Sequence, residues 1–406
     1  MERVEAREAG FDPDRLARIG AFLEERYFAP ELFSGAQLLI GRDGKVVHFS
    51  TAGKARASGE PMREDALFRI ASMTKPVTSI AFMMLLEEGK VTLDQPVDTV
   101  IPEWKRLGVY DGGGAGTPFR RKAPERPMIM LDLLRHTSGL TYGFQHRTNV
   151  DAAYRERKIE GWHGGYDLDG FVGALAEIPL EFSPGTAWNY SVSTDVVGLI
   201  VERLSGMKLD RFFEERIFAP LGMVDTAFSI PVDKTDRLGD AWAFQPGKGA
   251  MVYDQGEKSA WAEPPRLLAG GGGLISSVAD YHRFCSMLIG RGELDGVRLV
   301  SRKTIDLMTV NHLPGGADLT ELSRSLFSEA VNAGQGFGLG FGVNLDPAKT
   351  MLPGSKGEFY WGGMFSTSFF VDPVERLHMV FMTQLMPSTT YPVRRQLKTL
   401  IYSALT

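Results

Sequence analysis

The sequence predicts an α/β protein of the α+β type, with an antiparallel sheet flanked by helices and a second, mainly helical lobe. Two observations predict it: β-rich segments lie at both ends of the 406-residue chain, and helical segments separated by Gly- and Pro-containing loops fill its middle. The simplest closure pairs N-terminal with C-terminal strands. Residues 1–95 and 265–406 are therefore expected to form the α/β lobe, and residues 96–264 the helical lobe. A site is expected in the cleft between the lobes, because such clefts favour ligands.

The N-terminal segment predicts a helix followed by a hairpin. Asp12 is a suitable N-cap and Pro13 fits a first turn, so an amphipathic helix is expected over Asp12–Tyr27. Ser34–Ile40 and Val46–Ser50 are rich in β-forming residues. The Gly-Arg-Asp-Gly turn between them is typical of a hairpin.

The same patterns predict the remaining elements. A helix over Ser72–Glu88 is apolar in its middle and ends at Gly89. The other expected helices are Met128–Arg135, Tyr166–Ala176, Ser193–Ser205, Asp210–Phe218, Val278–Ile289 and Tyr391–Leu405. The expected C-terminal strands are Phe337–Val343, Glu358–Trp361, Ser366–Val371 and His378–Thr383.

Composition excludes several classes of function. The net charge is −5 with both signs mixed, so the chain lacks the basic field of a nucleic-acid-binding protein. The longest apolar helical run, Ile80–Leu86, is far shorter than a membrane span. The single cysteine, Cys285, permits no internal disulfide. The charged N-terminus lacks the apolar stretch of a signal peptide, so a cytoplasmic location is the default expectation.

Ser72 and Lys75 form the central motif, Ser-x-x-Lys, at the start of a predicted helix. Residues i and i+3 share a helix face, so the two side chains can touch. A serine hydroxyl needs a neighbouring base, and a desolvated lysine can lose its proton near neutral pH. The helix N-terminus also favours developing negative charge. Ser72 is therefore a candidate nucleophile and Lys75 its base.

The motif alone is weak, since Ser205 and Lys208 match it too. This second copy follows a predicted helix and has Gly206 in its middle. Glycine is the preferred residue just beyond a helix C-terminus. We therefore expect the second copy to be a helix end and surface turn.

Two further segments bear on the chemistry. A turn brings Tyr190 just before the helix that starts near Ser193, where a tyrosine beside a lysine could relay a proton. The alternative is a tyrosine packed by its ring with its hydroxyl bonded. Near the C-terminus, Gly362 and Gly363 permit close approach to a strand, or else mark a β-bulge.

A substrate carbonyl beside that strand could accept hydrogen bonds from the N–H groups of Met364 and Ser72. Two such donors would form an oxyanion hole, which stabilises the negative charge of a tetrahedral intermediate.

With these motifs, the sequence resembles the class C β-lactamase-like superfamily of penicillin-recognising serine hydrolases, and most closely the family VIII carboxylesterases. The resemblance covers nearly the whole chain and implies a β-lactamase/transpeptidase-like fold. Further segments that carry it are Leu133-Leu134-Arg135-His136-Thr137-Ser138-Gly139-Leu140, Phe182-Ser183-Pro184-Gly185, Pro220-Leu221-Gly222-Met223 and Gly272-Gly273-Leu274.

The resemblance implies a role for each candidate residue. Ser72 matches the acylated nucleophile, Lys75 the lysine that helps deprotonate it, and Tyr190 the tyrosine that accepts and returns the proton. Met364 matches the strand residue whose N–H completes the oxyanion hole. Tyr142 matches an aromatic residue that lines the entrance of similar esterases.

Two departures from β-lactamases affect the expected substrate. Trp361-Gly362-Gly363 stands where lactamases carry Lys-Thr-Gly, and loss of a charge-assisted anchor weakens binding by roughly 1.5–3 kcal/mol. Val192 stands where lactamases carry the asparagine of Tyr-x-Asn. Both changes favour neutral, fairly hydrophobic esters as the small-molecule partner.

The function expected from the sequence is a serine carboxylesterase that hydrolyses short- to medium-chain neutral esters through an acyl-Ser72 intermediate. Alternatives are an acyltransferase with an alcohol acceptor, a weak β-lactamase, a D-amino-acid peptidase and a non-catalytic binding protein. No serine has glycine two positions before it, which disfavours an α/β-hydrolase, whereas a catalytic His136 stays a minor alternative. The histidines and the cysteine lack metal-site spacing, so neither metal nor organic cofactor is expected.

Overall fold

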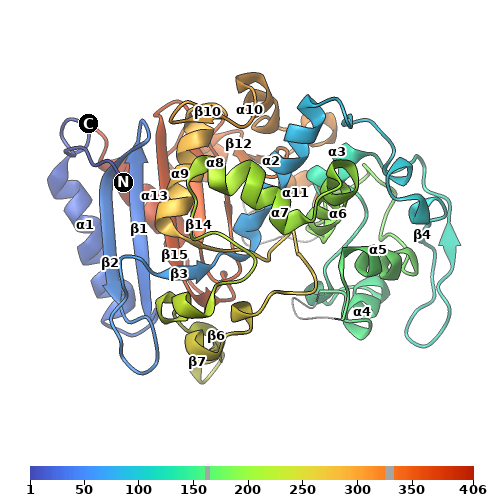
Figure 1. Cartoon of the computed structure of the whole chain (residues 1–406), viewed down its shortest axis with the longest axis horizontal. Helices are drawn as coiled ribbons and strands as arrows, with labels where there is room; N and C mark the ends of the chain where they lie inside the picture. Colours follow the sequence, from blue (N-terminus) through green and yellow to red (C-terminus); the bar gives the residue numbers. More distant parts are fainter. Residues whose placement is uncertain (161–164, 325–332) are drawn as a thin grey trace.

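The computed structural model of the chain describes residues 1–160, 165–324 and 333–406, and a seven-stranded sheet in the order β11-β12-β13-β14-β15-β1-β2 is its largest sheet (Figure 1). Its strands are β1 Gly35–Arg42, β2 Lys45–Gly53, β11 Gln335–Phe337, β12 Gly342–Asn344, β13 Phe359–Gly362, β14 Ser368–Asp372 and β15 Leu377–Thr383. Neighbouring strands are antiparallel throughout. Because β1 pairs with β15, the two ends of the chain meet in one sheet, and the predicted α+β fold class is confirmed.

The inner strands β1 and β15 are buried on both faces, and their side chains alternate between two hydrophobic cores, whereas the edge strand β2 is mostly partly exposed. Leu38 and Ile40 of β1 pack with α1 (Pro13–Leu23) and α13 (Val393–Ser403), whereas Leu39 belongs to the core that α9 shares. α9 (Val278–Ile289) packs directly on β15 and β1. The N- and C-terminal ends of the chain lie close together, where Phe11 bridges to Leu405 (Figure 1).

Most predicted helices are present with small shifts at their ends, and the predicted helix Asp210–Phe218 is α7 (Leu209–Phe213) followed by a π-helical turn over Glu214–Phe218. α6 and α9 have the predicted bounds, and α1 continues as a π-helical turn over Glu24–Phe28. The remaining helices are α2 Thr74–Glu87, α3 Met130–Leu134, α4 Asn149–Glu156, α5 Leu168–Ala176, α6 Ser193–Ser205, α7 Leu209–Phe213, α8 Ala219–Leu221, α10 Arg302–Met308, α11 Leu319–Leu322 and α12 Pro347–Thr350. α2 packs against α6 and is buried on all sides over most of its length.

Small ladders join distant parts of the chain. They consist of β3 Leu67–Arg69 with β8 Ile275–Ser277, β4 Val109–Tyr110 with β5 Arg121–Lys122, β9 Glu293–Leu294 with β10 Val297–Arg298, and β16 Leu385–Met386 with β6 Ala241–Gln245 and β7 Gly249–Asp254. The β6–β7 hairpin was not predicted. It lies in the segment expected to be mainly helical, yet β6 pairs with β16 near the C-terminus.

The prediction of one strand over Phe337–Val343 is wrong, because this segment is the β11–β12 hairpin. Gly340 turns the chain with a φ of +93°, in the region that favours glycine. A Cβ at Gly340 would lie 2.3 Å from the Ser79 hydroxyl on α2. The turn therefore packs tightly against α2. This close packing requires glycine at position 340, and the turn divides the predicted strand into two.

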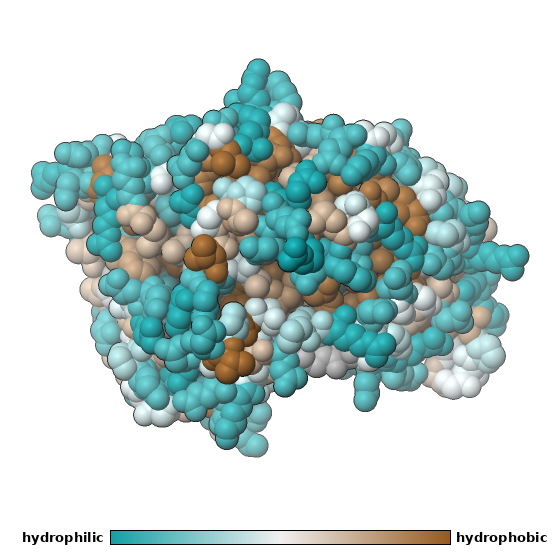
Figure 2. Space-filling model, in the orientation of Figure 1, coloured by the Kyte–Doolittle hydropathy of each residue, from teal (hydrophilic) through white to brown (hydrophobic). Residues whose placement is uncertain are grey.

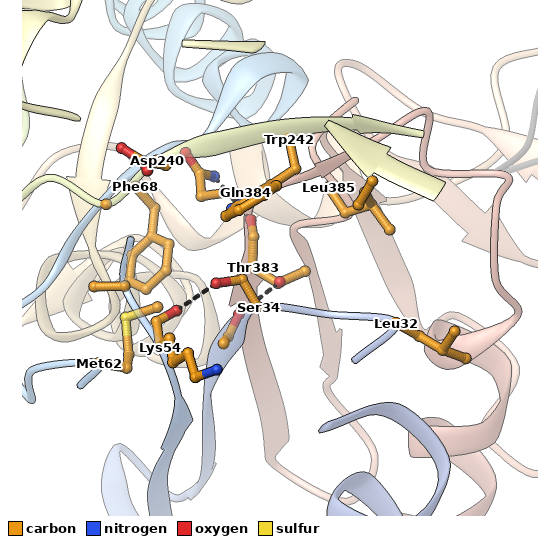
Figure 3. A pocket seen from close by; sticks show the side chains of 14 residues that line it. Leu32, Ser34, Lys54, Met62, Phe68, Asp240, Trp242, Thr383, Gln384 and Leu385 are labelled. Atoms are coloured by element: carbon orange, nitrogen blue, oxygen red, sulfur yellow. Dashed lines mark hydrogen bonds between the residues drawn. The ribbon is translucent and has the colours of Figure 1, made fainter. Parts of the chain in front are cut away.

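A small pocket lies where β6 passes the ends of β1 and β15 (Figure 3). Hydrogen bonds from Ser34 Oγ to Lys54 O (2.8 Å) and from Thr383 Oγ1 to Gly35 O (2.7 Å) fix the backbone beside it. Its volume of about 10 Å³ fits about one water molecule. This pocket is therefore too small for an organic substrate, and its lining includes neither Ser72 nor Tyr190.

Polar side chains cover most of the face drawn in Figure 2, where they interrupt the hydrophobic areas. Single exposed apolar side chains such as Val224 and Val374 are ordinary on a protein surface. Among the helices of the described ranges, none is both long enough and apolar enough to cross a bilayer.

The contact between Lys398 on α13 and Glu358 gives a prediction about stability. Lys398 Nζ lies 2.5 Å from Glu358 Oε1, and the Glu358 side chain is 1% exposed. Lys398→Met leaves a buried carboxylate without its cation, so we expect unfolding in urea to become easier by about 3–5 kcal/mol. Lys303→Met is the matched control, since Lys303 is 74% exposed in its pair with Asp306 and should contribute under about 1 kcal/mol. Equal effects of the two substitutions would contradict the prediction.

Candidate active site

Ser72 stands at the N-terminus of α2, where the chain leaves β3. A single 3-10 turn over Ala71–Met73 precedes α2, so the α-helix begins two residues later than predicted. Ala71 has a φ of +46°, which is uncommon for a residue other than glycine. Ser72 is partly exposed, whereas Ala71 and Met73 on either side are buried. The local backbone therefore presents the serine hydroxyl and hides its neighbours.

Lys75 lies beneath this serine and is 1% exposed. Its Nζ is 3.2 Å from Ser72 Oγ, as the i, i+3 spacing predicts. Nζ also donates to the hydroxyl of Tyr142 (3.0 Å) and to the carbonyl oxygen of Gly271 (2.6 Å). These oxygens can accept the N–H groups of an ammonium, so protein oxygens replace hydration around a buried positive charge.

Tyr190 lies beside Lys75, just before α6. Its ring centroid is 4.6 Å from Lys75 Nζ, and the residue is 1% exposed. Trp361 on β13 donates an Nε1–H bond to the Tyr190 hydroxyl at 3.3 Å. Trp361 is itself 1% exposed, so it packs against Tyr190 and presents little surface to solvent. The structure thus brings together the lysine, the tyrosine and the Trp-Gly-Gly segment.

The two glycines after Trp361 permit close approach. A Cβ at Gly363 would lie 2.4 Å from the carbonyl oxygen of Ile70, which precedes the Ser72 turn. β13 pairs with β14 in an unbroken register, so the segment is a close contact and not a β-bulge. Outside the helices and strands of the described residues, no backbone carbonyl is paired with the N–H of Met364. The oxyanion hole formed by the N–H groups of Ser72 and Met364 stays a prediction.

Tyr142, whose role at the entrance stays a prediction, contacts Lys75 and is mostly buried. It is 9% exposed, and burial followed by the negative charge of Asp195 raises the pKa of its hydroxyl well above the usual value. The aromatic residue that faces solvent is Phe144, which is 51% exposed and stacks on Tyr142 with centroids 4.8 Å apart. Phe144 was not predicted from the sequence, although its place two residues after Tyr142 could have indicated a second aromatic side chain near the site.

His136 does not form a Ser-His pair with Ser72. Its Nδ1 lies 3.1 Å from Ser191 Oγ, and its ring packs 4.9 Å from the ring of Tyr190. Burial, and then the positive charge of Lys75, hold the pKa of His136 well below its ordinary value. A neutral, buried histidine supports the shape of the site, and the alternative of a catalytic His136 finds no geometric support.

The second Ser-x-x-Lys copy is a helix end, as predicted. Gly206 has a left-handed φ of +73° at the C-terminus of α6. The Lys208 side chain is 65% exposed and pairs with Glu202 at 3.1 Å. Within residues 1–160, 165–324 and 333–406, no group of three or more His, Cys, Asp or Glu side chains is arranged to hold a metal ion.

The contact of Gly363 with Ile70 predicts the effect of one added methyl group. Gly363→Ala forces the end of β13 away from the Ser72 turn, and a displacement near 1 Å can lower a catalytic rate about 10²-fold. We expect such a loss of kcat/KM on p-nitrophenyl butyrate. In Gly173→Ala, the control on α5, the new Cβ meets nothing within 4 Å. Activity retained in Gly363→Ala would show that this approach does not position the site.

The amino-acid sequence is similar to those of known proteins over most of its length. A family model for β-lactamase matches residues 25–403. Protein Rv1367c of Mycobacterium tuberculosis is 36% identical over 88% of this chain and 87% of its own length. Esterase EstB of Burkholderia gladioli is 31% identical over 86% of this chain and 85% of its own, and acyltransferase calJ of Penicillium decumbens is 30% identical over 85% and 82%.

Structural comparison agrees on the fold. The solved structure of EstCE1, described as a hydrolase with promiscuous acyltransferase activity, superposes with a TM-score of 0.78 at 24% identity. The match covers 96% of this chain and 99% of EstCE1. The expected β-lactamase/transpeptidase-like fold is thereby confirmed, and the chain belongs to the β-lactamase family.

Proposed function

We propose that this protein is a serine carboxylesterase that hydrolyses short- to medium-chain neutral esters through an acyl-Ser72 intermediate. The observation that carries the proposal is the contact of buried Lys75 Nζ with Ser72 Oγ at 3.2 Å, directly under the Tyr190 ring. A buried amine beside a partly exposed serine hydroxyl is the arrangement that activates serine as a nucleophile. Similarity to esterase EstB supports ester substrates.

The mechanism proceeds in two steps. Ser72 Oγ attacks the ester carbonyl carbon while the pair of Lys75 and Tyr190 accepts its one proton, and the carbonyl oxygen becomes an oxyanion on the N–H groups of Ser72 and Met364. The C–O bond to the alcohol then breaks, and the pair passes that proton through Tyr190 to the leaving alkoxide. In the second step water attacks the acyl-Ser72 ester and gives a proton to the same pair, which returns it to Ser72 Oγ as the acyl C–O bond breaks and the acid is released.

Neutral substrates are favoured by what surrounds these groups. Trp361 and Val192 occupy the places of two polar residues of β-lactamases, and both are 1% exposed. Neither side chain can form a charge-assisted bond to a carboxylate. On the solvent side, Phe144 and Met364 are 51% and 39% exposed and offer apolar contact to a hydrophobic ester. These surroundings support the proposal of neutral, hydrophobic ester substrates.

An acyltransferase is the second candidate, supported by similarity to acyltransferase calJ. Its acyl-enzyme would be the same, with an alcohol in place of water in the second step. Weak β-lactamase or D-amino-acid peptidase activity are further alternatives, disfavoured by the missing carboxylate anchor at Trp361.

Turnover of p-nitrophenyl acetate, butyrate and octanoate, with nitrocefin in parallel, tests the proposal. We expect ester turnover far above nitrocefin turnover in the wild type. Ser72→Ala should lose at least about 10³-fold in kcat, because the variant lacks the hydroxyl that would carry the acyl group. Ser205→Ala, the matched serine of the second Ser-x-x-Lys copy, should retain full activity.

Three outcomes would contradict the esterase assignment. Equal losses in Ser72→Ala and Ser205→Ala would remove Ser72 from the mechanism. Ester turnover that requires an added alcohol acceptor would favour the acyltransferase. Nitrocefin cleavage faster than ester cleavage would favour a β-lactamase.

A further inference from the structure

Asp195 is a buried carboxylate close to the site that the mechanism above does not use. It lies in the first turn of α6, five residues after Tyr190, and is 7% exposed. Its Oδ1 accepts a hydrogen bond from the N–H of Gly271 at 2.9 Å. A carboxylate in such a place is unfavourable unless something compensates its charge.

Gly271 connects this carboxylate to Lys75. Its N–H faces Asp195, and its carbonyl oxygen accepts the 2.6 Å bond from Lys75 Nζ. A Cβ at Gly271 would lie 2.5 Å from Asp195 Oδ2, so only glycine fits here. The preceding carbonyl, of Gly270, accepts a bond from Thr78 Oγ1 on α2 at 2.6 Å. The glycine segment, Gly270 and Gly271, is thus held between α2 and α6. Gly271 alone separates the carboxylate of Asp195 from the amine of Lys75.

The two charges act on each other across this residue. Burial is the largest effect and raises the pKa of Asp195 above its ordinary value, and the positive charge of Lys75 and the Gly271 N–H offset part of that rise. An interaction that favours the carboxylate beside an ammonium equally favours the ammonium beside a carboxylate. In a site with little water, such attraction is screened weakly.

Other titratable groups that face this pair come from the neighbouring segments. Tyr142 and Tyr190 contact Lys75, and burial keeps Tyr142 protonated by raising its pKa. His136 is neutral because burial lowers its pKa. Glu160 acts on Asp195, and burial raises the pKa of Glu160 to about 7. Asp195 is therefore the carboxylate that faces Lys75 through a single residue.

We propose that Asp195 is a positioning residue that acts through Gly271 to hold the amino group of Lys75 against Ser72 and to set the pH at which Lys75 releases its proton. In the acylation step, the O–H bond of Ser72 breaks as an N–H bond forms on Lys75. Asp195 stabilises the ammonium formed at that moment. The kinetic consequence rests on the proposed esterase function, whereas the coupling between Asp195 and Lys75 does not.

Asp195→Asn tests this role, since the amide oxygen can still accept the Gly271 N–H while the charge is gone. The ammonium of Lys75 then loses a stabilising anion, so it releases its proton at lower pH. We expect the acid limb of kcat/KM against pH for p-nitrophenyl acetate to move down by about one pH unit. A merely structural role would lower activity at all pH values and leave the limb in place, which would overturn the proposal.

Asp280→Asn is the matched control. Asp280 is also buried, in the first turn of α9, and burial raises its pKa to about 6. It accepts bonds from Thr226 Oγ1 (2.8 Å) and the Asp225 N–H (2.7 Å), so its surroundings do not include Lys75. We expect an unchanged acid limb in this variant. An equal shift in both variants would overturn the specific role of Asp195.

A titration that needs no substrate separates this inference from the esterase proposal. The Lys75 signal in ¹³C-lysine NMR spectra, identified by its loss in Lys75→Met, should titrate at lower pH in Asp195→Asn than in the wild type. An unchanged midpoint overturns the inference even if esters are hydrolysed, and a shifted midpoint supports it even if they are not. If Asp195→Asn fails to fold, Asp195→Ser replaces it, with the same expected shift.

Discussion

Lys75 places an amino group where almost no water reaches, between α2, the start of α6 and the glycine segment at Gly271. A charge in such a place is tolerated only if oxygens replace its hydration shell, and Ser72, Tyr142 and Gly271 supply them. An amine held beside a serine hydroxyl in this way is placed to accept the hydroxyl proton. The contacts that stabilise Lys75 Nζ in the interior therefore also position it for the proposed chemistry.

The rest of the fold positions groups around that nitrogen. α2 is buried along most of its length, so the Ser72–Lys75 face cannot rotate. The sheet made from both ends of the chain brings the end of β13 to within contact of Ile70, almost three hundred residues away in sequence. Glycine at position 363 makes this approach sterically possible. Tyr190 is then enclosed between the Lys75 amine and the Trp361 indole.

Local patterns in the sequence predicted the parts that depend on neighbouring residues. The bounds of α6 and α9, the contact of Ser72 with Lys75, and the C-cap role of Gly206 follow from helical periodicity and capping. The approach of Trp361 to Tyr190 could not follow from such patterns, because the two residues are far apart in the sequence. The strand predicted over Phe337–Val343 was wrong because a contact with α2, invisible in sequence, demands a turn at Gly340.

The missed residues have the same physical explanation. Asp195 is one polar residue inside a helix, a pattern typical of a solvated face, and only the packing of the Gly271 segment shows that it is buried beside Lys75. The β6–β7 hairpin lies inside a stretch dominated by helices and is stabilised by β16, which follows more than one hundred residues later. The division of the chain at residues 95 and 265 stays a prediction.

The central claim is that Ser72, activated by Lys75, carries the acyl group. The most direct measurement is rapid acid quenching of the protein with p-nitrophenyl butyrate, followed by intact mass and peptide mapping. We expect a transient mass increase of one butyryl group, located on the peptide that contains Ser72 and formed far more slowly in Lys75→Met. An acyl group on any other residue, or ester turnover without an adduct in quenched samples that also capture the initial burst, would contradict the claim.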